Sequence, residues 1–139
     1  MNSEPKELHL RRKQKIQEDK DFTSARISES ARYVGFGLAA LTVAMLTSDA
    51  AFPKRLIAAH GNFVILASAF GCITVISDYL HYLFGYYASE EAAGNVSGDF
   101  GYRTQSLFYK LRRGFFWTKQ IFAVVGACIF IAILLLTMS

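Results

Sequence analysis

Four polar residues near the same end of two apolar segments carry the chemistry that this sequence suggests. Asp78 lies with His81 and Tyr82 in one apolar run, and Lys119 lies in another. Ionisable groups at membrane depth are costly and usually partnered, so Asp78 and Lys119 are candidates for an ion pair. His81 and Tyr82 follow Asp78 by three and four residues, which places all three on one helix face. These four residues form a candidate intramembrane polar patch.

The elements that must position this patch are three long apolar runs. Of the 139 residues, 53% are hydrophobic and 14% are aromatic, which exceeds what a soluble surface usually tolerates. We predict spans at about residues 31–47, 62–85 and 115–138, the first being just long enough for a hydrocarbon core about 30 Å thick. The expected fold class is therefore an all-α membrane protein with three transmembrane helices.

Two further helices are expected outside the spans. Residues 1–30 alternate basic and acidic side chains with a thin apolar stripe, and this pattern predicts a charged cytoplasmic helix. That helix is interpreted first as solvated, then as an arm that binds a partner or lipid, and last as a nucleic-acid binder. A second, amphipathic helix is expected at Thr104–Arg113, before the third span, which leaves residues 31–139 as the transmembrane domain.

The connections and helix faces give weaker signals. Pro53 cannot continue a regular helix, so we expect the first span to end before it and Lys54–His60 to form a short connection. Gly35 with Ala39, and Ala67 with Gly71, have the spacing that lets helices approach closely. Such pairs also occur by chance in apolar sequence, so a helix contact at these faces stays one of two readings.

The orientation follows from the distribution of lysine and arginine. The N-terminal tail carries eight, the first loop two and the second loop four. Because basic residues near span ends resist translocation, three spans predict a cytoplasmic N-terminus and an outside C-terminus. We expect an integral protein of the bacterial inner (plasma) membrane. The basic and aromatic residues around the start of the third span are assigned to lipid headgroup contact, namely Arg103, Lys110, Arg112, Arg113 and Trp117.

This topology puts Asp78 and Lys119 on the same side of the membrane. Counted from their span ends, Asp78 lies about 12 Å and Lys119 about 9 Å inside. Three interpretations stay open: Lys119 reaches the headgroups while Asp78 meets water, the two form a structural ion pair, or they form part of a proton- or ion-handling site.

The remaining motifs argue against enzymatic chemistry. His9, His60 and His81 lie in three separate regions, and the two cysteines, Cys72 and Cys128, lack metal-site spacing. The sequence has no phosphate-binding glycine loop and no nucleophile elbow. We therefore expect no enzyme activity, no cofactor and no metal.

Three function classes fit these features. The preferred one is a non-enzymatic accessory or adaptor subunit that anchors a cytoplasmic partner through residues 1–30. The alternative is an oligomeric pore or membrane-permeabilising effector, with Asp78, His81 and Lys119 near its cytoplasmic mouth. A carrier is weakest because three spans leave no inverted repeat. The expected partners are the lipid bilayer, a second copy of the chain and a cytoplasmic protein, but not nucleic acid.

Overall fold

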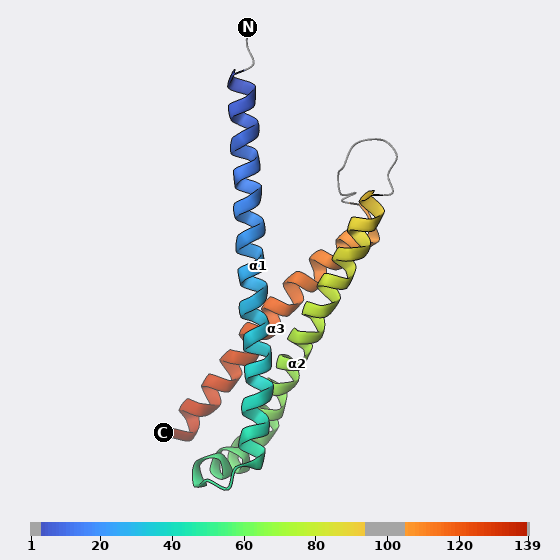
Figure 1. Cartoon of the computed structure of the whole chain (residues 1–139). Coiled ribbons are helices and arrows are strands. Elements are labelled where there is room, and N and C mark those ends of the chain that lie inside the picture. Colours follow the sequence, from blue (N-terminus) through green and yellow to red (C-terminus); the bar gives the residue numbers. More distant parts are fainter. Residues whose placement is uncertain (1–3, 94–104, 139) are drawn as a thin grey trace.

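The regular structure of this protein is α-helical in every part that the computed structural model describes, residues 4–93 and 105–138. The helices are α1 (Glu4–Thr47), α2 (Ala51–Ala93) and α3 (Leu107–Met138), and Figure 1 shows them crossing as a three-helix bundle. Helix α1 and α3 run in the same direction, and α2 runs against them. The expected all-α fold is confirmed.

Helix α1 joins the charged N-terminal segment to the first span without a break. The expected boundary near residue 30 falls inside this 44-residue helix. No proline occurs between Pro5 and Pro53, so nothing removes a backbone donor along its length. The first turns of α1 consequently project past the other helices as a separate rod (Figure 1).

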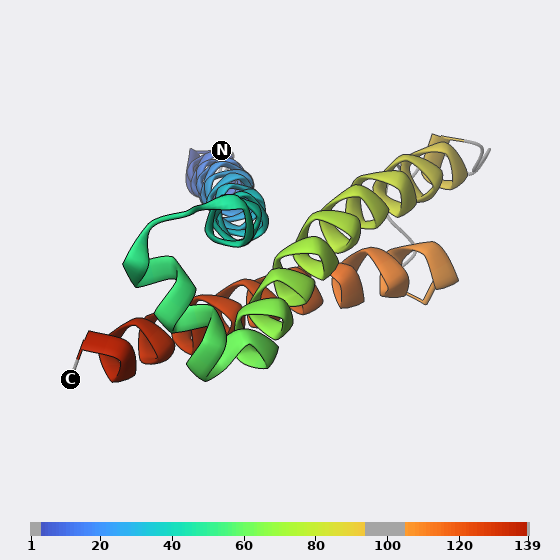
Figure 2. The same ribbon diagram turned by 90° about the horizontal axis from the view of Figure 1, so that it is seen from below.

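The segment expected as a short connection between the first two spans is instead helical. Helix α2 begins at Ala51, so Pro53 lies in its first turn, where a missing N–H group removes no helix hydrogen bond. The expectation for Lys54–His60 was wrong because the proline lies in the first turn of this helix and does not interrupt it. A kink follows at His60, whose φ of −135° and ψ of 22° are not helical. Figure 2 shows the short helix before the kink lying across the end of the bundle.

Helix α3 likewise combines the amphipathic segment and the third span in 32 continuous residues. Aromatic rings hold its first turns against α2. Phe84 stacks on Phe115 with ring centroids 5.5 Å apart, and Tyr87 stacks on Phe108 at the same distance. The Ser106 hydroxyl also donates a hydrogen bond to Glu91. The α2–α3 pair is thereby fixed at the end where α1 leaves the bundle.

Small residues set the crossing of α1 and α2. A Cβ atom on Gly35 would lie 2.8 Å from the Gly71 carbonyl oxygen, and one on Gly71 would lie 2.6 Å from the Gly35 carbonyl oxygen. The two backbones therefore touch at this point, as the small-residue spacing allows. Below it Leu38, Ala67 and Phe130 form a buried cluster that joins all three helices.

Three helical segments are long and apolar enough to cross a membrane: Asp21–Thr47, Ala51–Ala92 and Leu107–Met138. Large apolar side chains on their outer faces are exposed, including Ile65 at 57% and Leu135 at 65%. A surface of this kind suits contact with lipid chains better than water. The chain therefore has the make-up of a small integral membrane protein.

Candidate functional site

An ion cluster of Arg32, Asp78 and Lys119 lies where the three helices meet. The Lys119 ammonium donates hydrogen bonds to Asp78 Oδ1 at 2.6 Å and to the Ser28 hydroxyl at 2.7 Å. The Arg32 Nε group donates to the other carboxylate oxygen, Oδ2, at 2.7 Å. Each oxygen of Asp78 thus accepts from a different cation, and each helix contributes at least one member of the cluster.

Two of the three charged side chains are buried, and the third is partly exposed. The side chains of Lys119 and Asp78 are 0% and 5% exposed, whereas that of Arg32 is 40% exposed. Lys119 therefore does not reach the surface within this chain, and its charge is compensated internally. Removing one partner from a buried pair leaves an uncompensated charge, which costs far more than the pair itself contributes.

Aromatic rings fill the remaining space around the cations. The Lys119 ammonium lies 5.5 Å from the ring centre of Tyr82 and 5.4 Å from that of Phe116. The Arg32 guanidinium lies 5.6 Å from the Tyr82 ring centre. These distances permit cation–π attraction to ring faces. Tyr82, one residue of the expected patch, therefore contributes its ring to both cations.

His81 belongs to a different network. Its Nδ1 atom lies 2.9 Å from the backbone carbonyl oxygen of Arg112 on α3. A carbonyl oxygen can only accept, so Nδ1 carries the proton, and in the neutral ring Nε2 is an acceptor. The three residues expected on one helix face, Asp78, His81 and Tyr82, therefore do not form a single network. Asp78 bonds Arg32 and Lys119, whereas His81 bonds the α3 backbone.

Arg32 and Ser28 are the cluster members that were not predicted from the sequence. Both lie on α1, and Arg32 was counted with the basic tail. A signal was present in the distances from the opposite span ends. Arg32 precedes the outer end of the first span, at Thr47, by about 22 Å of helix. Asp78 follows the outer end of the second span, at His60, by about 27 Å. Lys119 precedes the outer end of the third span, at Met138, by about 29 Å. The three residues therefore lie at comparable depth.

The residues expected to contact lipid headgroups differ in how exposed their side chains are. Lys110, Arg113 and Trp117 are exposed, whereas Arg112 is partly buried. Arg103 lies outside the described residues. A Cβ atom on Gly85 would lie 3.5 Å from Arg112 Nε, so this side chain packs across α2. Contact of these residues with headgroups stays a prediction.

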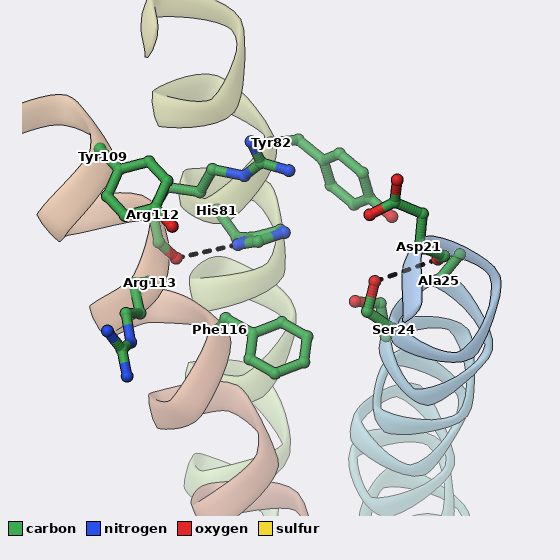
Figure 3. A pocket seen from close by; sticks show the side chains of 10 residues that line it. Asp21, Ser24, Ala25, His81, Tyr82, Tyr109, Arg112, Arg113 and Phe116 are labelled. Atoms are coloured by element: carbon green, nitrogen blue, oxygen red, sulfur yellow. Dashed lines mark hydrogen bonds between the residues drawn. The ribbon is translucent and has the colours of Figure 1, made fainter. Parts of the chain in front are cut away.

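A polar cavity of about 520 Å³ opens above the ion cluster, between α1 and the α2–α3 pair. We call it the interface cavity. Figure 3 shows Asp21 and Ser24 on its α1 wall, with His81, Tyr82 and Arg112 opposite. Ser28, Tyr82 and Phe116 line the cavity and also contact Lys119, so the cavity and the cluster share a wall.

A second, mostly apolar groove of about 410 Å³ lies between α1 and α3. Ile27, Ala31, Val34, Ala123 and Val124 are among its lining residues. The Gln120 side chain also lines it, and its Nε2 atom is buried with no hydrogen-bond partner among the described residues. An unsatisfied buried amide is destabilising, so Gln120 marks a weak point of this packing.

The chemistry of the ion cluster is electrostatic. Both carboxylate oxygens of Asp78 are occupied by cations, which leaves Asp78 poorly placed to act as a base. Within residues 4–93 and 105–138 no group of three or more His, Cys, Asp or Glu side chains could hold a metal ion. The arrangement is suited to fixing the rotation and depth of three helices relative to one another.

Comparisons with known proteins add no assignment, because no protein-family model, curated protein or solved structure matches this chain.

Proposed function

We propose that this protein is a non-enzymatic membrane subunit whose three-helix bundle anchors a cytoplasmic arm for a partner protein. The arm is the part of α1 from residue 4 to residue 20. The interface cavity and the ion cluster involve α1 only from Asp21 onward. The arm therefore continues for about 26 Å beyond the bundle.

The observation that carries this proposal is the arm, which projects beyond the other two helices (Figure 1). Ile16 in the arm is 56% exposed, and Phe22 just below it is 65% exposed. Basic and acidic residues surround these two side chains in the sequence. A charged helix with a few exposed apolar anchors is typical of surfaces that bind another protein.

The ion cluster supports an anchoring role for the bundle. Lys119 and Asp78 bond each other and α1, so the angle at which the arm leaves the membrane is held by buried contacts. The same burial argues against the alternative of an oligomeric pore lined by Asp78 and Lys119, because a pore between copies needs these groups on the protomer surface. The excess of basic residues in the tail supports a cytoplasmic position for the arm.

Site-specific photo-crosslinking in cells tests the proposal. A crosslinking amino acid at Ile16 or Phe22 should give a discrete product with a different protein, and Lys15→Glu should weaken it. Ile65, which is 57% exposed on the apolar face of α2, is the matched control position and should give no such product. Products containing only this chain would contradict an adaptor role.

Reconstituted vesicles test the pore alternative directly. The adaptor proposal expects the purified chain to leave ion leakage unchanged. Leakage that depends on the protein and is abolished by Asp78→Asn would contradict the proposal and favour the pore. Asp49→Asn, at an exposed aspartate at the other end of the bundle, is the matched control.

A further inference from the structure

We propose that the interface cavity binds the headgroup of an aminophospholipid, a ligand that carries both a phosphodiester and a primary ammonium. Three features lead to this class of ligand: opposite charges on facing walls, an acceptor nitrogen held in a defined state, and a position at the level of the membrane interface.

The charges of the cavity are divided between its walls. Arg112 and Arg113 line it from α3, and Asp21 lines it from α1. In Figure 3 the Arg112 side chain extends toward Tyr82, and Arg113 points along α3 away from Tyr82. Arginine matches a phosphate in charge and hydrogen-bond geometry, and a carboxylate matches an ammonium. A ligand bearing both groups complements the two walls at once, which a purely anionic ligand does not.

His81 adds a second acceptor for the ammonium. Because its Nδ1 donates to the Arg112 carbonyl oxygen, the neutral ring presents the Nε2 lone pair, and Figure 3 shows Nε2 directed toward α1. Ser24 and Tyr109 supply hydroxyl groups on the two walls. A primary ammonium has three N–H donors to offer this set, whereas a quaternary ammonium has none.

The position of the cavity favours a lipid as the source of these groups. Exposed aromatic side chains surround this level of the bundle, with Tyr79 at 67%, Tyr86 at 65% and Trp117 at 57% exposure. Tyrosine and tryptophan gather where the hydrocarbon meets the headgroups. The volume of about 520 Å³ lies within the usual range for small-molecule sites, about 300–1,000 Å³.

Bound ligand would also connect the two helices that share the least packing. Helices α1 and α3 contact each other less than either contacts α2. A headgroup between Asp21 and Arg112 would link them above the ion cluster. The site thus places a lipid at the point where the arm leaves the bundle.

Native mass spectrometry of the full chain in mild detergent tests this inference. Phosphatidylethanolamine, phosphatidylcholine and phosphatidylglycerol with identical acyl chains are titrated separately, together with soluble O-phosphoethanolamine. We expect phosphatidylethanolamine to bind at least about tenfold more tightly than the other two lipids, because only it satisfies both walls. Soluble O-phosphoethanolamine should compete weakly, since it lacks acyl chains.

Two variants test which wall of the cavity binds the ammonium and which binds the phosphate. Asp21→Asn should remove the preference for phosphatidylethanolamine over phosphatidylglycerol, and Arg112→Gln should weaken binding of all three lipids by about tenfold or more. Asp49→Asn and Arg55→Gln repeat these changes at exposed residues at the far end of the bundle and should change nothing. Asp21 is exposed, and far-ultraviolet circular dichroism of both variants checks that they fold as the native chain does.

Three results would overturn the inference. Equal retention of the three lipids would remove the headgroup selectivity. Unchanged lipid selectivity in Asp21→Asn would show that the ligand's ammonium does not bind Asp21 on the α1 wall. Soluble O-phosphoethanolamine that binds as tightly as the lipid would assign the cavity to a soluble ligand.

Discussion

The ion cluster predicts an unequal response to removal of its members. At 2.6 Å the Asp78–Lys119 pair has a gross attraction of about 6 kcal/mol at an effective dielectric constant of about 20, which offsets part of the cost of burying both charges. Asp78→Asn removes the carboxylate and leaves Lys119, which is 0% exposed, with no counter-ion. We expect this variant to lose about 3–5 kcal/mol of unfolding free energy.

The other two members should tolerate substitution better. Lys119→Met leaves Asp78 bonded to Arg32, so we expect a loss of only about 1 kcal/mol, since the relief of a buried cation offsets part of the lost bond. Arg32→Gln should cost about 1 kcal/mol or less, because Asp78 keeps its bond to the buried Lys119 and the Arg32 side chain is itself 40% exposed. The double variant Asp78→Asn with Lys119→Met should be more stable than Asp78→Asn alone by about 2 kcal/mol.

Reversible unfolding by sodium dodecyl sulfate in mild detergent, followed by far-ultraviolet circular dichroism, measures these free energies. Asp49→Asn serves as the control, because Asp49 pairs with Lys54 on the exposed end of the bundle and its loss should leave stability unchanged. A double variant as unstable as the sum of the two single variants would refute the closed cluster. So would an Asp78→Asn variant as stable as the native protein, since a surface-seeking Lys119 would not need Asp78.

The remaining predictions use the same unfolding measurement. Gly35→Ala should lose about 1–3 kcal/mol because its Cβ would lie 2.8 Å from the Gly71 carbonyl oxygen, whereas Gly37→Ala should gain up to about 1 kcal/mol because nothing lies within 4 Å. Equal effects at Gly35 and Gly37 would contradict the close helix crossing. Gln120→Leu should gain about 1–2 kcal/mol, since the unsatisfied amide would be replaced by an apolar side chain. A loss of stability in Gln120→Leu would mean that Gln120 bonds something outside the single chain.

Much of this fold was predictable because, in a bilayer, the position of a residue along its helix largely sets its depth in the membrane. Apolar length identifies a span, and the spacing of Asp78 and Lys119 from span ends indicates their depth. The helix ends were less predictable. Pro53 has opposite meanings inside a helix and in its first turn, and the sequence alone did not decide between them. No proline marks the kink at His60, and Leu56 of the short helix before it is buried against Val64 and Ile133.

In the candidate site, the depth of a residue in the membrane is not enough to predict whether it joins the ion cluster. Arg32 lies at the depth of Asp78 and Lys119, yet its inclusion depends on the face that α1 turns toward α2. That rotation is set by the Gly35–Gly71 crossing, which brings the two backbones into contact. Ser28 follows from the same rotation, since it lies one turn before Arg32 on the same face.

The sequence by itself determined the helical class, the number of apolar spans, and the common depth of Asp78 and Lys119, because each of these depends on position along a helix axis. Only the tertiary structure decided that Arg32 and Ser28 complete the ion cluster, that His81 bonds the Arg112 carbonyl oxygen, and that a polar cavity lies above them. These features depend on rotation about each axis and on crossing angle. Packing between helices fixes both, and hydropathy along one chain does not record them.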